Sequence, residues 1–135
     1  MDVLTPEQRR RCMGSISGKN TKPELIIRKL LFSLGYRYRL HYSNLPGKPD
    51  LVFPGKRKVI FIHGCFWHRH DCSKGNSMPT NNSEFWQKKL SDNVIRDSKN
   101  SNDLKKLGWE VFVVWTCELK NVELLAIKLN LYLQT

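Results

Sequence analysis

The sequence has no long hydrophobic run and few acidic residues. No stretch reaches the roughly 18 apolar residues that a membrane-spanning helix needs, so we expect no spanning segment. The first residues, MDVLTPEQRRRC, are charged and contain no apolar core, so we expect no signal peptide and a cytoplasmic protein. Only 12 acidic residues stand against 23 basic ones, which gives a formal net charge of +11.

This positive charge favours a polyanionic partner, which would be held by phosphate contacts and counterion release. The alternatives are a role in solubility or binding to an anionic membrane surface. No amphipathic basic helix of the membrane type is present, so we expect nucleic acid and no membrane. Up to residue 40, nine basic residues face three acidic ones: Arg9, Arg10, Arg11, Lys19, Lys22, Arg28, Lys29, Arg37 and Arg39.

A chain of 135 residues with 40% hydrophobic residues is expected to form one domain, 1–135. Residues 1–20 have little apolar material, so we treat them as a basic arm that either frays or orders on a ligand, ahead of a core over 21–135. Hydrophobic periodicity and stop signals predict helices over 22–34, 83–107 and 121–133, and strands over 36–42, 50–53, 58–63 and 109–115.

This order predicts an α/β fold with a mixed central sheet flanked by helices. A long helix between the strands at 58–63 and 109–115 forms a βαβ unit, so these two strands should be parallel. Cys65 and Cys117 each follow the end of one of them by two residues. Both thiols should therefore lie at the same edge of the sheet.

Cysteines are scarce as well, and in the cytoplasm their four thiols are not expected to form disulfides. Cys12 lies apart in the basic arm. Cys65, Cys72, Cys117 and a histidine could form the closed tetrahedral set of three sulfurs and one nitrogen that zinc favours in structural sites. Spacing does not choose between His68 and His70, and three reduced cysteines near a core are the alternative.

A second set of residues suits phosphodiester chemistry. If Phe53 faces Lys58 across the hairpin, Asp50 lies beside Ile62 and His63, and a carboxylate there could hold Mg²⁺ against a phosphate. A backbone carbonyl of the neighbouring strand could add a ligand. Imidazoles can move the protons of such a reaction. The candidates are Asp50, His63, His68, Asp97 and Glu24.

Each carboxylate also has a simpler interpretation. Glu24 is accounted for by the capping box that starts its helix, and Asp50 by the turn that precedes it. Asp97 falls on the inward stripe of the long helix, where it could orient an imidazole, but it could pair with Arg96 or Lys99 at the surface.

Large rings accompany the histidines. Phe66 and Trp67 follow Cys65 directly, and Trp86 lies near the start of the long helix. Such rings beside a basic surface could stack on bases or wedge between them. Equally, they could pack the zinc loop onto the core.

Taken together, these motifs resemble the very short patch repair (Vsr) endonucleases. The matching stretches are GKPDLVF, VIFIHGCFWHRHDC, SEFWQKKL, NVIRD and LGWEVFVVWTCEL, with MGSISGKNTKPE agreeing more loosely. The resemblance spans nearly the whole chain. It implies a variant of the PD-(D/E)xK restriction-endonuclease fold with a structural zinc site. It also implies nicking of double-stranded DNA 5′ to the T of a T·G mismatch left by deamination of 5-methylcytosine.

The resemblance also implies residue roles. Asp50 would ligate Mg²⁺ together with the backbone carbonyl of Ile62, where the family often has Thr. His63 and His68 would be the catalytic imidazoles, with Asp97 supporting His63 and Glu24 near the active site. The implied zinc ligands are Cys65, His70, Cys72 and Cys117, and the implied DNA-binding residues are Phe66, Trp67, Trp86 and Met13.

The implied partners are T·G-mismatched duplex DNA, a cytosine-5 DNA methyltransferase by functional linkage, and mismatch-repair proteins. Nicking one strand suits a monomer, which would work on DNA in the nucleoid. Two alternatives remain: a restriction-type endonuclease of the same fold that cuts intact duplex, and a zinc-containing DNA-binding module without catalysis.

Overall fold

The computed structural model describes residues 21–40, 42 and 44–134. The expected arm over 1–20, with Met13 and Cys12, lies outside these residues. The helices are α2 (Lys22–Ser33), α3 (Ser83–Lys106) and α4 (Val122–Gln134), and the strands are β1 (Leu51–Phe53), β2 (Lys58–His63) and β3 (Glu110–Trp115). Short 3₁₀ turns cover Pro54–Lys56 and Thr116–Lys120.

The three strands form one mixed sheet in the order β1-β2-β3. β1 pairs antiparallel with β2, so that Phe53 faces Lys58 as predicted. β2 and β3 run parallel, with His63 opposite Trp115, which confirms the βαβ unit. Both parallel strands therefore end at the same edge, and the residues that follow them leave the sheet side by side.

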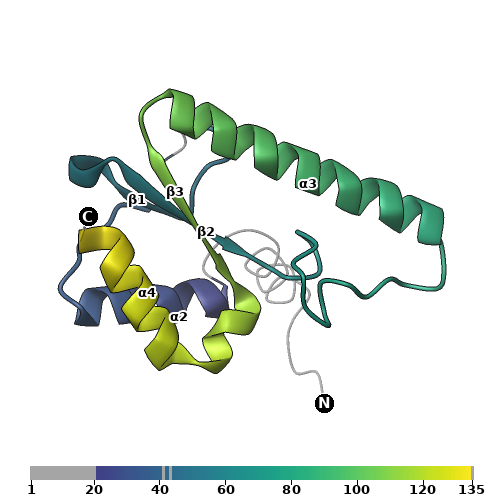
Figure 1. The fold of residues 1–135 in the computed structure, drawn as a ribbon, viewed down its shortest axis with the longest axis horizontal. Coiled ribbons are helices and arrows are strands. Elements are labelled where there is room, and N and C mark those ends of the chain that lie inside the picture. The colour runs from purple at the N-terminus through teal and green to yellow at the C-terminus, as the bar shows by residue number, and fades with distance from the viewer. Residues whose placement is uncertain (1–20, 41, 43, 135) are drawn as a thin grey trace, which may run out of the picture.

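Helices cover both faces of the sheet, with α3 on one side and α2 and α4 on the other (Figure 1). Alternate strand residues serve the two faces. Leu51, Ile60 and Val114 pack with α2 and α4, whereas Val52, Val59 and Phe61 pack with Leu104 of α3. None of the helices among the described residues is long and apolar enough to cross a membrane.

The helix starts and stops follow local chemistry. At α2, the Thr21 side chain accepts a hydrogen bond from the Glu24 backbone N–H at 3.5 Å, Pro23 lies in the first turn, and Gly35 follows the helix end with a φ of 91°. At α3, Gly108 has a φ of 90°, a conformation that ends a helix and favours glycine.

The predicted strand over 36–42 is wrong for the residues that the structure describes there. Only an isolated bridge between Arg39 and Val52 forms, with backbone hydrogen bonds of 2.9 and 3.0 Å. Every second side chain of this segment still packs against the core, as the alternating pattern predicted: Tyr36, Tyr38 and Leu40. β1 is only three residues long between Pro49 and Pro54, and so short a strand offers little edge for a longer ladder.

Candidate active site and metal centre

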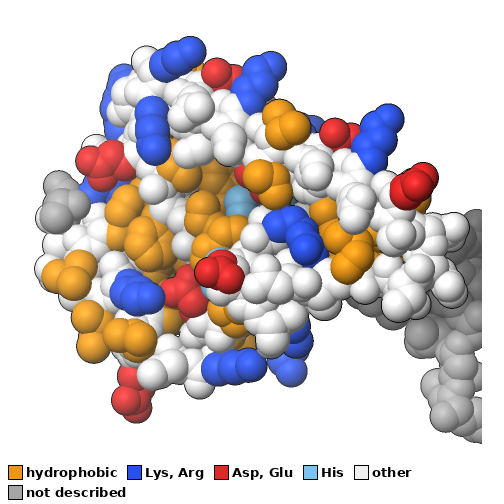
Figure 2. Space-filling view, turned by 45° about the vertical axis from the view of Figure 1, so that its right-hand side comes forward, with side chains coloured by type: hydrophobic (Ala, Val, Ile, Leu, Met, Phe, Trp, Pro, Cys, Tyr) orange, Lys and Arg blue, Asp and Glu red, His pale blue; other side chains and the backbone are white. Residues whose placement is uncertain are grey.

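An open groove of about 780 Å³ lies between α3 and the sheet. Four of the predicted catalytic residues line it: Asp50, His63, His68 and Asp97. Figure 2 shows histidine atoms in a hollow of this face, bordered by hydrophobic and basic side chains. The parallel strand ends and α3 thus bring residues from 50 to 97 into one cleft.

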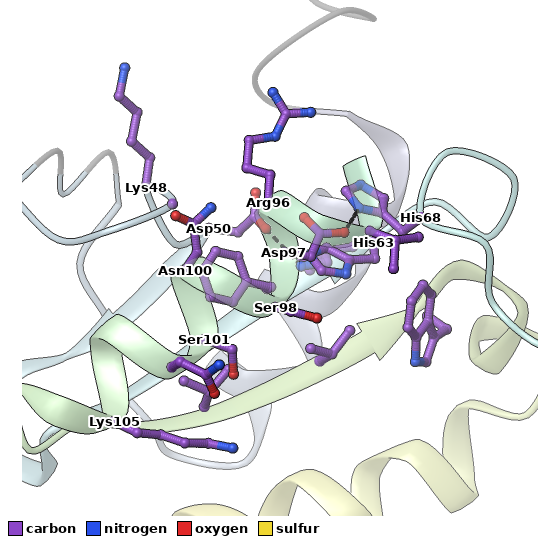
Figure 3. Close-up of a pocket in the computed structure, with 18 residues that line it drawn as sticks. Lys48, Asp50, His63, His68, Arg96, Asp97, Ser98, Asn100, Ser101 and Lys105 are labelled. Carbon is purple, nitrogen blue, oxygen red and sulfur yellow. Dashed lines mark hydrogen bonds and ion pairs between the residues drawn. The ribbon is translucent and has the colours of Figure 1, made fainter. Parts of the chain in front are cut away.

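The two imidazoles form a stacked pair. The ring centroids of His63 and His68 are 3.9 Å apart, with only 7° between the ring planes. His68 Nδ1 lies 2.5 Å from Asp97 Oδ2, an interaction marked in Figure 3. In the structure, the hydrogen-bonding partner of Asp97 is therefore His68, whereas the resemblance implied that Asp97 supports His63. Burial, with His68 alongside, lowers the pKa of His63 to about 4, so His63 is neutral near pH 7.

Asp50 lies just before β1 and is anchored to β2. Its Oδ2 accepts a hydrogen bond of 2.7 Å from the backbone N–H of Ile62, and the predicted hairpin register, which places Asp50 beside Ile62, is confirmed. Burial raises the pKa of Asp50 to about 6 despite this hydrogen bond, and nearby Glu24 raises it further. A half-buried carboxylate with a second acidic group close by is a donor set that suits a divalent cation.

Glu24 is buried on α2 and lies within electrostatic reach of Asp50. Its Oε2 accepts a hydrogen bond of 3.1 Å from Arg28, one turn along the helix. One half of the capping box considered for Glu24 is present, because its backbone N–H donates a hydrogen bond to Thr21 Oγ1. Its carboxylate nevertheless lies close enough to raise the pKa of Asp50, so the two interpretations are compatible.

A cysteine-histidine cluster lies at the same edge of the sheet. Cys65, His70, Cys72 and Cys117 place one ligand atom each within 4.8 Å of all the others. Cys117 Sγ lies 3.5 Å from His70 Nδ1. Geometry therefore brings His70 into this cluster, while His68 belongs with His63 and Asp97.

The donor set of this cluster fits zinc. Burial opposes the thiolate of Cys65, but hydrogen bonds from Thr116 and Cys117 outweigh it and lower the pKa of Cys65 to about 7. Burial and the adjacent sulfurs raise the pKa of Cys117 to about 11. The cluster thus accommodates one negative charge readily and resists a second. A bound divalent cation would relieve this repulsion, and three sulfurs with one nitrogen form a closed zinc set.

The loop that carries Cys72 and His70 is tightly folded. A Cβ added at Gly75 would lie 1.7 Å from the carbonyl oxygen of His70, so only glycine fits there. The Gly75 N–H also points at Cys72 Sγ at 3.4 Å. Gly75 therefore fixes the position of two cluster residues.

The predicted rings form one cluster beside the site. Centroid distances are 5.3 Å for Phe66–Trp67, 5.8 Å for Phe66–Trp86 and 5.7 Å for Trp67–Trp86. Trp67 is 45% exposed, and the Lys89 ammonium lies 5.8 Å from its ring centroid. An exposed ring with a cation above it has the chemistry that stacks on nucleic-acid bases.

Three further residues of the site escaped sequence analysis. Buried Asn93 donates a hydrogen bond of 3.0 Å to the Trp67 carbonyl and accepts one from Arg96, and so ties the ring loop to α3. The Thr116 hydroxyl lies 3.4 Å from the Cys65 sulfur, and Trp115 contacts three of the histidines. Of these three, only Trp115 had a signal in the sequence, because it ends the strand that was predicted to run parallel to the strand ending at His63.

Comparisons with known proteins match this site to one family. The family model described as DNA mismatch endonuclease Vsr matches residues 1–74. The chain is 47% identical over 129 residues to the type II nicking enzyme V.XorIIP of Xanthomonas oryzae, covering 96% of this chain and 94% of that protein. It is 40% identical over 122 residues to the DNA mismatch endonuclease Vsr of Escherichia coli, covering 90% and 78%. These matches confirm the resemblance, and the chain belongs to the Vsr family of DNA mismatch endonucleases.

Proposed function

We propose that this DNA mismatch endonuclease nicks double-stranded DNA 5′ to the T of a T·G mismatch and so starts repair of deaminated 5-methylcytosine. The stacked His63–His68 pair carries the proposal, because it shares one groove with the half-buried carboxylate of Asp50. This arrangement offers proton transfer and cation binding at a single phosphodiester. The name of the E. coli relative, a mismatch endonuclease, supports it.

Each imidazole would handle one proton transfer, His63 at the attacking water and His68 at the leaving oxygen. His63 is neutral near pH 7, since burial lowers its pKa to about 4, and can accept a proton from the attacking water. His68 uses Nδ1 for Asp97, so proton exchange with the leaving oxygen would go through Nε2. Asp97 would fix the orientation of that ring and so the tautomer.

Asp50 and the backbone carbonyl of Ile62 would hold Mg²⁺, which supplies charge neutralisation at the scissile phosphate when bound. The Asp50 carboxylate already accepts a hydrogen bond from the Ile62 backbone N–H, so it lies beside the peptide that would supply the second ligand. The isoleucine in place of the family's frequent threonine leaves this backbone ligand intact. Glu24 would add negative charge to the cation site from α2.

Zinc would be bound by Cys65, His70, Cys72 and Cys117 and would stabilise the loop beside the active site. The fold would be a variant of the PD-(D/E)xK restriction-endonuclease fold. Two features support this assignment: an acidic residue just before one strand of a hairpin, and a proposed catalytic histidine at the end of the next strand. The mixed sheet with helices on both faces is consistent with it.

Selection of the mismatch would rest on the rings. Phe66, Trp67 and Trp86 would wedge into the duplex beside the T·G pair, where weak pairing lowers the cost of unstacking. The arm over 1–20, with Met13, would enter the minor groove. The positive charge of the chain would supply the phosphate attraction.

The biological setting follows from the lesion. A T·G pair arises when a methylated cytosine deaminates, so we propose a functional link to a cytosine-5 DNA methyltransferase and to later mismatch-repair proteins. One nick requires one active site, so the enzyme would act as a monomer on DNA of the cytoplasmic nucleoid.

The test is a Mg²⁺-dependent cleavage assay on two labelled duplexes that differ only in one T·G pair replacing C·G. We expect one nick, on the T strand and 5′ to the T, in the mismatched duplex alone. Cutting of both duplexes would instead identify a restriction-type endonuclease. Binding without cutting across a panel of sequence contexts would identify a DNA-binding module.

A further inference from the structure

Trp115 lies where the catalytic and metal-binding parts of the site meet. It is the last residue of β3 and pairs in register with His63, the last residue of β2. Neighbours on parallel strands point their side chains to the same face, so the indole follows His63 onto the α3 side of the sheet. Trp115 accordingly lines the groove, while Cys117 lies two residues further along the chain.

The indole contacts one histidine of the metal cluster and both histidines of the catalytic pair. It stacks on His70 with the centroids 4.4 Å apart and 19° between the planes. It meets His63 edge-to-face at 5.3 Å and 71°, and His68 at 6.4 Å and 65°. One side chain thus touches rings from two clusters that share no residue.

We propose that Trp115 is a positioning residue that holds the His63–His68 stack in place and couples it to the zinc cluster through His70. The proposal rests on the proposed roles of these residues. His68 is also held by Asp97, whereas the ring contacts of His63 with described residues are those with Phe61, His68 and Trp115. Without the indole, His63 would lose its contact with the side chain that stacks on His70 of the metal cluster.

The backbone around Trp115 reinforces the coupling. The Trp115 N–H donates a hydrogen bond of 3.0 Å to Glu118 Oε1, which closes the turn that carries Cys117. Thr116 contacts both the backbone N–H and the sulfur of Cys65 at 3.4 Å. A displacement of the cluster would therefore move the indole, and with it the imidazole pair.

The test compares Trp115→Phe, Trp115→Leu and Trp115→Ala on the duplex that the wild type nicks. Phenylalanine keeps a ring for His70 and His63, so its single-turnover nicking rate should stay within about threefold of wild type. Leucine and alanine remove the ring, and a misplacement of about 1 Å can cost on the order of 10²-fold in rate. Their DNA affinity, measured with Ca²⁺ in place of Mg²⁺, and their zinc content should remain those of the wild type.

Trp109→Leu provides the matched control, because Trp109 directly precedes the same strand and packs on the core cluster around Leu104 but does not line the groove. This variant should lose stability without losing nicking rate. Trp115→Leu with wild-type nicking, or with binding and rate lost in parallel, would overturn the proposal. If the Trp115→Ala variant does not fold, the comparison of Trp115→Leu with Trp115→Phe still tests the positioning role.

The outcome is separable from that of the proposed function. If the wild type fails to discriminate T·G from C·G, the function is wrong, yet the Trp115 variants can be ranked on any duplex that it cuts. If the wild type discriminates and the leucine variant matches its rate, only the positioning role fails.

Discussion

At the scale of single residues, the site depends on how a few charges are placed in a partly buried groove. His63 and His68 are close enough to share a proton path, and Asp97 restrains one of them at 2.5 Å. Asp50 and His63 have pKa values displaced in ways that suit their proposed roles, because burial keeps the imidazole neutral and makes the carboxylate receptive to a cation. Figure 3 shows these groups converging from the sheet, from the loop after β2 and from α3.

Asp97→Asn tests the orienting carboxylate. The amide keeps the size of the side chain but removes its charge and can present its NH₂ group to His68. We expect the nicking rate to fall on the order of 10²-fold, within the range that general acid-base catalysis contributes, at unchanged DNA affinity. Single-turnover kinetics and a binding titration measure the two effects. Asp92→Asn changes an exposed carboxylate of the same helix and should have no effect; an equal loss there would refute the assignment.

The raised pKa of Asp50 predicts how the magnesium requirement depends on pH. Below about pH 6 the folded, metal-free protein carries a proton on this carboxylate, so protons compete with Mg²⁺. The Mg²⁺ concentration for half-maximal nicking should therefore rise as pH falls through about 6 and level off above it. A Mg²⁺ titration at each pH measures this. A requirement that is flat from pH 5 to 8 would contradict the role of Asp50.

At the scale of elements, the loop between β2 and α3 carries most of the chemistry without regular secondary structure. It holds three of the four proposed zinc ligands, two of the rings and His68, and it is fixed by Asn93 on one side and Thr116 on the other. Gly75 permits its tightest contact, against the His70 carbonyl. The loop is therefore ordered by side-chain contacts and, in our proposal, by zinc.

Gly75→Ala tests this loop. Its Cβ would collide with the His70 backbone, so we expect loss of zinc and a stability decrease of about 1–3 kcal/mol, the usual cost of overpacking. Zinc content and urea unfolding measure both. Gly55→Ala is the control, because a Cβ there meets nothing within 4 Å. Normal zinc content in the Gly75 variant would show that the loop can shift to admit a side chain.

Much at this scale could be predicted from the sequence. For the part of the chain that the structure describes, the apolar runs and stop signals predicted the three strands and three helices, and the βαβ rule predicted the parallel pair that brings Cys65 and Cys117 together. Spacing could not choose between His68 and His70, since both lie in an irregular loop whose turns depend on tertiary contacts. The strand over 36–42 failed for a similar reason: alternation reports which residues face the core, not whether a partner strand is long enough to pair.

At the scale of the whole molecule, charge and shape agree with a duplex partner. The chain carries a net charge of +11, and basic side chains border the groove. Figure 3 shows Lys48 and Arg96 extending to the same side of the groove near Asp50. Lys48 has a φ of 48°, next to Gly47, which approaches Asn100 closely. This unusual backbone indicates that the loop is held in a specific position beside the carboxylate.

Lys48→Ala tests the contribution of this border. Each phosphate contact adds about 0.9 to the slope of log affinity against log salt, so the slope should become shallower by about that amount. Binding titrations at several salt concentrations measure it. Lys106→Ala removes the same charge from the end of α3, away from the groove lining, and should leave the slope nearly unchanged. Equal slopes in the two variants would mean that net charge alone matters.

The most direct measurement compares wild type with Asp50→Ala on the T·G duplex, with nicking and binding followed in the same preparation. The account predicts that the variant binds the mismatch with wild-type affinity and retains its zinc but does not nick. Nicking by Asp50→Ala at the wild-type rate would contradict the central claim that this groove is the active site.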